Sequence, residues 1–260
     1  MTFYETPGDL RAACRVGDYD GPTSGHARGY VQANMVILSA ADAEDFRQFC
    51  ARNPKPCPVL EVLDPGDPEP RQCAPGADIR TDLSRYRVFR EGEPVGDVTD
   101  ISDIWEEDFV TFLLGCSFTA EEALIAAGLE PRHIKETGIV PMFRTTKQTK
   151  GAGKFTGPFV VSMRPYKPKD AQRAAEVTEK YPMAHGGPIQ IGNPAALGIR
   201  DVTDPEYGEP VTIMDGEVPV FWACGVTPQE AIRNAMPRIA ITHAPGYMFV
   251  SDIASDSEKV

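Results

Sequence analysis

The chain has 260 residues, of which 38 are acidic and 26 are basic, so its net charge is −12 at pH 7. A field of that sign repels phosphate backbones and argues against a nucleic-acid partner. No apolar run approaches the roughly 18 residues that a membrane span needs, and residues 1–16 lack the apolar core of a secretory signal. We therefore expect a soluble, cytoplasmic protein with no membrane partner.

The first half of the chain reads as alternating helices and strands. We expect a helix over 7–14, a strand over 30–38, a helix over 41–52, a strand over 58–63, a Pro- and Gly-rich loop over 64–80, a strand over 86–89, a turn over 91–94, a strand or short helix over 108–116, a helix over 119–128 and a strand over 141–145. Strand, helix and strand in sequence over residues 30–63 predict a parallel crossover.

The pattern then restarts. We expect a strand over 159–163, a helix over 169–181, a strand over 189–191, a hairpin of 211–214 and 218–223, a helix over 228–235 and a strand over 247–250. Together these elements predict an α/β protein with a mixed sheet core and helices packed on it, in one domain of residues 1–260.

Two stretches of the chain are alike. Residues 112–127 read FLLGCSFTAEEALIAA, and residues 220–235 read VFWACGVTPQEAIRNA. The identities fall at matched element boundaries, so they predict an internal duplication of a strand–Cys–helix–strand unit, with a first half over 25–146 and a second half over 155–252. The alignment pairs Cys116 with Cys224, Thr119 with Thr227, Glu122 with Glu230, Ala123 with Ala231, and Met142-Phe143 with Met248-Phe249.

Each repeated unit consists of an apolar segment, a cysteine, a two-residue turn and a helix start. Thr119 with Glu122, and Thr227 with Glu230, have the spacing of a capping box, in which both side chains bond free amides of the first turn. Free amides at a helix N-terminus attract anions, so two such ends predict a site for two carboxylates, or for one carboxylate and a leaving oxygen. The alternative interpretation is that both cysteines are small buried residues of a duplicated core.

Metal and cofactor sites are not predicted. The six cysteines form no CxxC pair and the four histidines are scattered, so we expect reduced thiols, no zinc site and no other metal. The glycines near residue 151 lack the GxxxxGK[ST] register of a phosphate loop, so we expect no nucleotide and no organic cofactor.

Long ungapped motifs run along nearly the whole chain. They include GYVQANMVIL at 29–38, RNPKPCPVLEV at 52–62, APGADIRTDLSRYRVF at 74–89, GCSFTAEEAL at 115–124, HGGPIQIG at 185–192, GEVPVFWACGVTPQ at 216–229 and ITHAPGYMFVSD at 241–252. In these motifs the chain resembles the hydro-lyase family that includes the D-glutamate cyclase domain. Tyr247 stands where that family commonly shows His.

The resemblance implies an α/β fold with a smaller α+β subdomain. It also implies a lyase that eliminates water from a small carboxylate or amino acid, with cyclisation of D-glutamate to 5-oxo-D-proline as one activity within the family. Two alternatives stay open. A cofactor-independent two-cysteine racemase would use Cys116 and Cys224 on either side of one α-carbon, and a non-catalytic carboxylate-binding protein would bind acidic amino acids without turnover. A homo-oligomer is also left open.

Cyclisation of glutamate requires a group that deprotonates an ammonium, donors for an oxyanion and a cation for the α-carboxylate. His243 lies before an Ala-Pro-Gly turn that restricts its backbone, and histidine titrates near neutral pH. Ser117 lies at a helix start, and Arg164 and Arg144 end apolar strands. The predicted catalytic residues are His243, Cys224, Cys116 and Ser117, and the predicted substrate-binding residues are Arg164, Arg144, His185 and Asn193.

Overall fold

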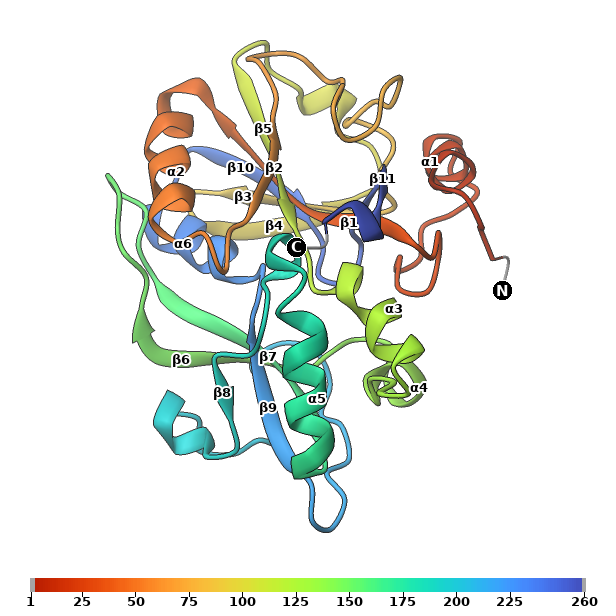
Figure 1. The fold of residues 1–260 in the computed structure, drawn as a ribbon. Helices are drawn as coiled ribbons and strands as arrows, with labels where there is room; N and C mark the ends of the chain where they lie inside the picture. The colour runs from red at the N-terminus through yellow and green to blue at the C-terminus, as the bar shows by residue number, and fades with distance from the viewer. Residues whose placement is uncertain (1–2, 259–260) are drawn as a thin grey trace.

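The computed structural model of the protein describes residues 3–258. Two β-sheets organise the chain, and every strand pairing in both is antiparallel. In Figure 1 the larger sheet lies in the upper part of the molecule, and the smaller sheet lies below it with helix α5 against it. The predicted α/β class is confirmed.

The larger sheet is built around β1, whose inner residues are all buried. Its order is β2-β5-β1-β10-β3-β4, and β11 pairs with the start of β1. These strands are β1 (Tyr30–Ser39), β2 (Val59–Val62), β3 (Tyr86–Arg90), β4 (Glu93–Val98), β5 (Phe109–Gly115), β10 (Ile239–His243) and β11 (Phe249–Ala254). Because β1 and β2 are both antiparallel to β5, they run in the same direction, as a parallel crossover requires, but β5 lies between them.

The smaller sheet has the order β6-β7-β9-β8. Its strands are β6 (Met142–Gln148), β7 (Pro158–Tyr166), β8 (Gln190–Ile191) and β9 (Val218–Ala223). The predicted hairpin of 211–214 with 218–223 is wrong, because residues 211–214 form no strand and β9 pairs with β7 and β8 instead. Apolar alternation there reflects Val211 packing into the core beside Phe143.

Helices and loops cover both sheets. Two helices, α2 (Ala40–Arg52) and α6 (Thr227–Ala235), pack their apolar residues on one face of the larger sheet, with Phe46 and Phe112 edge to face. The long loop over 63–85 supplies Leu63, Ile79 and Leu83 to the other face. On the smaller sheet, α5 (Pro168–Thr178) buries Ala171 and Ala174 against β9. The remaining helical segments are α1 (Pro7–Arg15), α3 (Phe118–Ala126), α4 (His133–Glu136), η1 (Ser102–Ile104), η2 (Pro182–Ala184), η3 (Pro194–Leu197) and η4 (Ser255–Glu258).

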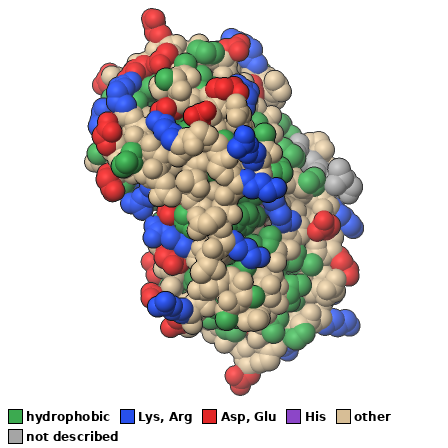
Figure 2. All heavy atoms as spheres, turned by 90° about the vertical axis from the view of Figure 1, so that its left-hand side faces the viewer, with side chains coloured by type: hydrophobic (Ala, Val, Ile, Leu, Met, Phe, Trp, Pro, Cys, Tyr) green, Lys and Arg blue, Asp and Glu red, His purple; other side chains and the backbone are tan. Residues whose placement is uncertain are grey.

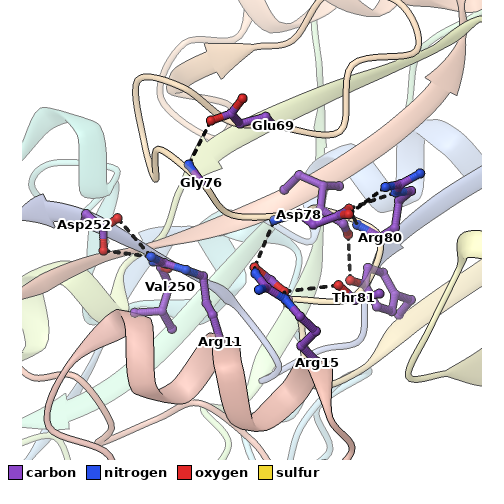
Figure 3. Close-up of polar contacts among 12 residues, drawn as sticks. Arg11, Arg15, Glu69, Gly76, Asp78, Arg80, Thr81, Val250 and Asp252 are labelled. Atoms are coloured by element: carbon purple, nitrogen blue, oxygen red, sulfur yellow. Dashed lines mark hydrogen bonds and ion pairs between the residues drawn. The ribbon is translucent and has the colours of Figure 1, made fainter.

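Two arginines of α1 hold the N-terminal helix to distant parts of the chain (Figure 3). Arg11 donates to the Val250 carbonyl oxygen at 2.8 Å and to both oxygens of the Asp252 carboxylate on β11. Arg15 binds the buried carboxylate of Asp82 in the long loop, and Asp82 also accepts the main-chain N–H of Asp78 at 2.9 Å. These charge-assisted bonds explain how a loop rich in Pro and Gly can be ordered.

Two strands were not anticipated from the sequence. All six residues of β4 are exposed, so this strand shows no apolar alternation, and Pro94 and Gly96 are poor strand formers. The other, β10, has five buried residues at the centre of the sheet, too short a run for its period to be diagnostic.

Within the described residues, no helix is long and apolar enough to cross a membrane. On the face shown in Figure 2, Lys and Arg side chains lie across the narrow middle of the molecule, and many Asp and Glu side chains lie nearer its upper and left edges. Basic and acidic side chains are therefore unevenly spread over this face.

Candidate active site

Two strand–helix junctions have the same local structure. β5 ends at Gly115 and α3 begins at Phe118, while β9 ends at Ala223 and α6 begins at Thr227. Each junction carries a buried cysteine followed by one small residue, Ser117 in the first and Gly225 in the second.

The predicted capping boxes are wrong. The hydroxyl of Thr119 accepts the main-chain N–H of Gln32 at 3.3 Å, and the hydroxyl of Thr227 accepts that of Val160 at 3.0 Å. Both threonines lie inside the first helical turn rather than before it. Their hydroxyls are buried against a neighbouring strand. Each accepts a main-chain N–H of that strand instead of an N–H of its own helix.

The strands beside the junctions are paired in matching register. In the larger sheet Ala33 lies opposite Gly115 and Phe249, and in the smaller sheet Val161 lies opposite Ala223 and Phe143. The outer strands are exchanged, because β11 of the predicted second half pairs with β1, and β6 of the predicted first half pairs with β7. Two repeats that had exchanged their last strands would pair in these registers. The duplication itself stays a prediction.

A small cavity lies where the two junctions meet. Its volume is about 30 Å³, enough for about two water molecules but not for an amino acid, so a substrate must displace part of the lining. The lining residues are Asn34, Cys116, Ser117, Phe118, Ile139, Val140, Met142, His185, Cys224, Gly225, Val226, His243, Pro245, Gly246 and Met248. All four predicted catalytic residues and His185 therefore lie around one cavity.

Both cysteines of the cavity are thiols at neutral pH. Burial raises the pKa of Cys116 to about 12, although the main-chain N–H of Phe118 offsets part of the effect. Burial likewise raises the pKa of Cys224 to about 11, with an opposing contribution from the N–H of Val226. The thiolate is the reactive form of cysteine, so neither sulfur is activated before a ligand binds.

Both histidines of the cavity are neutral. Burial lowers the pKa of His243 to about 4 and that of His185 to about 4. His243 ends β10, and its Nδ1 lies 3.0 Å from the main-chain nitrogen of Met35. His185 follows η2 with φ +72°, and its Nδ1 lies 2.8 Å from the carbonyl oxygen of Lys55.

Arg164 lies behind the cavity, in a buried network of charges. The sequence predicted it at the end of an apolar strand, but it lies within the antiparallel strand β7 and is 2% exposed. Its guanidinium donates to Glu121 Oε1 at 2.8 Å, to Ser117 Oγ at 3.2 Å and to Ser162 Oγ at 3.1 Å. His133 Nε2 lies 3.1 Å from the same oxygen of Glu121.

The charge of Arg164 is thus already paired. Burial alone would raise the pKa of Glu121, but His133 and Arg164 more than offset it, so the pKa lies below its usual value and the carboxylate is ionised. Arg164 therefore orients Ser117 and is not a free cation for a substrate carboxylate. His133 begins α4 and is 1% exposed.

The other two predicted substrate-binding residues do not line the cavity. Arg144 forms an ion pair with Glu230 at 2.9 Å and bonds the Tyr207 hydroxyl, which also contacts Glu230. Asn193 is exposed at the start of η3. Tyr247, the departure from the family pattern, lies under the Arg85 guanidinium at 4.9 Å and is not part of the lining either.

Asn34 lines the cavity but is not among the residues predicted from the sequence. Its Nδ2 donates to the Gly115 carbonyl oxygen at 2.7 Å, and its side chain lies over Gly225. A Cβ on Gly225 would lie 2.2–2.4 Å from the Asn34 amide atoms, so glycine is required there by contact. The repeat could have supplied two more lining residues, since Met142 and Met248 are aligned in it and both face the cavity.

No group of three or more His, Cys, Asp or Glu side chains among residues 3–258 is placed to hold a metal ion.

The chain is similar to known proteins over almost its full length. Residues 110–252 match the model of the family described as D-glutamate cyclase. A protein from Stutzerimonas stutzeri (strain A1501), named provisionally as a hydro-lyase, is 52% identical over 98% of this chain and 97% of its own length. YcsI from Bacillus subtilis (strain 168), also named provisionally as a hydro-lyase, is 53% identical over 98% of this chain and 99% of its own.

Proposed function

The chain belongs to the D-glutamate cyclase family of hydro-lyases, and on that premise we propose that it cyclises D-glutamate to 5-oxo-D-proline, with loss of water, in the cavity between the two junctions. The observation that carries the proposal is the pairwise lining of that cavity. Three residues of each junction line it, and so do Ile139, Val140 and Met142 at the start of β6 and three residues ahead of β11. A site built from both halves of the chain suits a substrate with two similar ends.

Main-chain donors at the two junctions support this assignment. Neither the amide N–H of Ser117 nor that of Gly225 has a main-chain partner within residues 3–258. Each lies just before a helix, where the backbone dipoles also favour negative charge. In our proposal each amide binds one carboxylate of glutamate, which brings the α-amine and the γ-carboxyl carbon together in a bent substrate.

A two-cysteine racemase is the second candidate, because Cys116 and Cys224 line the same cavity. Such an enzyme needs one thiolate to remove the α-proton and one thiol to return it from the opposite side. The raised pKa values of both thiols favour the cyclase, in which the cysteines fill space and donate weak hydrogen bonds.

The deciding experiment is incubation of the purified protein with D-glutamate, L-glutamate and 5-oxo-D-proline, with chiral chromatography of the products. We expect 5-oxo-D-proline from D-glutamate. Interconversion of D- and L-glutamate would instead establish the racemase, and binding of both without any product would establish a carboxylate-binding protein.

Cysteine variants give a second test of the same choice. In the cyclase, Cys116→Ala and Cys224→Ala should each retain turnover within about tenfold, since neither thiol transfers an obligatory proton. A loss of about 10²–10⁴ from either variant, the size expected when a general acid or base is removed, would favour the racemase.

A further inference from the structure

We propose that the two buried histidines of the cavity are fixed in opposite tautomers, so that His185 is the proton acceptor of the reaction and His243 is a hydrogen-bond donor. The reaction roles rest on the proposed cyclisation, whereas the tautomers rest only on main-chain contacts. The two parts can therefore fail separately.

His185 must carry its proton on Nδ1. That atom lies 2.8 Å from the carbonyl oxygen of Lys55, in the loop between α2 and β2. A carbonyl oxygen only accepts, so the ring nitrogen facing it must donate. A neutral imidazole has one N–H, and Nε2 is then left with a free lone pair. The backbone of His185 is left-handed, with φ +72°, a conformation that is uncommon outside glycine. It sets the direction in which the side chain leaves the main chain.

His243 must carry its proton on Nε2. Its Nδ1 lies 3.0 Å from the main-chain nitrogen of Met35, and that amide only donates. The Met35 carbonyl oxygen is farther from Nδ1, at 3.4 Å. A proton on Nδ1 would face the Met35 N–H, so the closer contact decides the tautomer.

The two Nε2 atoms are the ring nitrogens left for a ligand. Both histidines line the cavity, and neither Nε2 has a hydrogen-bond partner among residues 3–258. Burial lowers both pKa values to about 4, so each ring holds a single proton at neutral pH. The cavity thus offers one nitrogen lone pair and one N–H.

The lone pair of His185 can move both protons that the reaction transfers. Nε2 first takes a proton from the α-ammonium, and the free amine attacks the γ-carboxyl carbon, forming a C–N bond as the C=O electron pair moves to oxygen. The imidazolium returns this proton to one γ-oxygen. It then takes the second proton from the new C–N nitrogen and passes it to the same oxygen, which departs with its bonding pair as water.

Two protons leave nitrogen and two reach oxygen, so the enzyme ends unchanged. A single histidine serves nucleophile and leaving group in the same way in serine proteases. His243 does not transfer its proton, because that would leave an imidazolate. Its Nε2–H instead donates to the γ-oxygen that stays on carbon and gains charge during attack, the role of an oxyanion donor.

The tautomers are tested without any substrate. Long-range ¹H–¹⁵N correlation spectra of the ¹⁵N-labelled protein at pH 7 distinguish a protonated from an unprotonated ring nitrogen, and the His185→Gln and His243→Gln variants assign the signals among four histidines. We expect the proton on Nδ1 of His185 and on Nε2 of His243. The same tautomer at both residues, or an imidazolium at either, would overturn the proposal.

The reaction roles are tested with side chains that replace one ring nitrogen at a time. Asparagine can replace the Nδ1 contact with the main chain and lacks Nε2, whereas glutamine places an amide N–H near the Nε2 position. His185→Asn and His185→Gln should both lose about 10²–10⁴ in kcat, since neither offers a base. His243→Asn should lose about 10²–10³ in kcat, and His243→Gln should lose less, because its amide N–H can replace the Nε2 donor.

Thermal unfolding and far-UV circular dichroism of the four variants separate loss of catalysis from loss of fold. Equal losses from the two His243 variants, or retained turnover in His185→Gln, would contradict the assigned roles. If the tautomers are as stated and the wild-type protein forms no 5-oxo-D-proline, the proposed reaction fails and the donor and acceptor assignment stands.

Discussion

The β5–α3 and β9–α6 junctions share their main-chain contacts but not their polar side chains. At the first, Ser117 is bonded to a buried network of Arg164, Glu121 and His133. At the second, Gly225 has no side chain and Asn34 occupies the space above it. The first junction is supported by charge and the second by a close neutral contact.

This difference shows which features follow the repeat and which do not. The shape of the cavity comes from aligned residues, such as Cys116 with Cys224 and Met142 with Met248. Of its strongest polar groups, His185 lies outside the aligned stretches, and His243 lies between two of them and has no histidine counterpart in the first half. A cavity with aligned lining residues but unmatched polar groups can tell apart the two ends of glutamate, one with an amine and one without.

The largest expected effect is at the charged junction. Arg164→Met leaves the buried carboxylate of Glu121 without its guanidinium, and we expect the free energy of unfolding at pH 7 to fall by about 3–5 kcal/mol. Urea titration measures it. Arg238→Met is the control, because its ion pair with Glu106 is exposed and should contribute little to stability. Equal effects of the two variants would show that the network does not support the first junction.

Acidification should act through the histidines. Their pKa values are lowered on folding, so the unfolded chain binds more protons between pH 6.5 and pH 4, and stability falls as the pH drops through that window. Each histidine should contribute about 2 kcal/mol of loss between pH 7 and pH 5. Urea titrations at both pH values should show a smaller loss in His243→Gln than in wild type. An unchanged loss would mean that His243 is not buried in its neutral form.

The neutral junction is sensitive to size. Gly225→Ala places a methyl group against the Asn34 amide, and overpacking of this kind costs about 1–3 kcal/mol. Asn34→Ala makes room, so the double variant should be more stable than the sum of the two single effects predicts. Ser117→Ala, at the equivalent position, should show no such coupling to Asn34. Strict additivity of Gly225→Ala and Asn34→Ala in thermal unfolding would refute the contact.

The smallest expected effect is the one that should be equal at both junctions. Thr119→Val and Thr227→Val each remove a hydroxyl that accepts a strand N–H. We expect each to lower the free energy of unfolding by about 1–2 kcal/mol, since a buried amide loses its partner. A difference of more than about twofold between the two variants would show that the matched contacts are not equivalent in energy.

Local pattern was enough to predict most of the elements and several of the residues that line the cavity. Cys116 and Cys224 were identified because the repeat aligns them, and His243 because a Pro-Gly turn follows it. The partners of Arg164 could not be predicted, because Glu121 on α3, and His133 that contacts Glu121, come near it only in the folded chain. The capping boxes failed for a similar reason, as the competing strand amides belong to distant parts of the chain.

A crystal structure of the protein with bound 5-oxo-D-proline tests the central claim most directly. The account predicts the ligand between Ser117 and Gly225, with its carboxylate on the main-chain amide of one junction and its lactam carbonyl oxygen within hydrogen-bond distance of His243 Nε2. His185 Nε2 should face the ring nitrogen. A ligand bound away from both junctions, for example in the separate cavity lined by Arg144, Arg200 and Asp204, would contradict it.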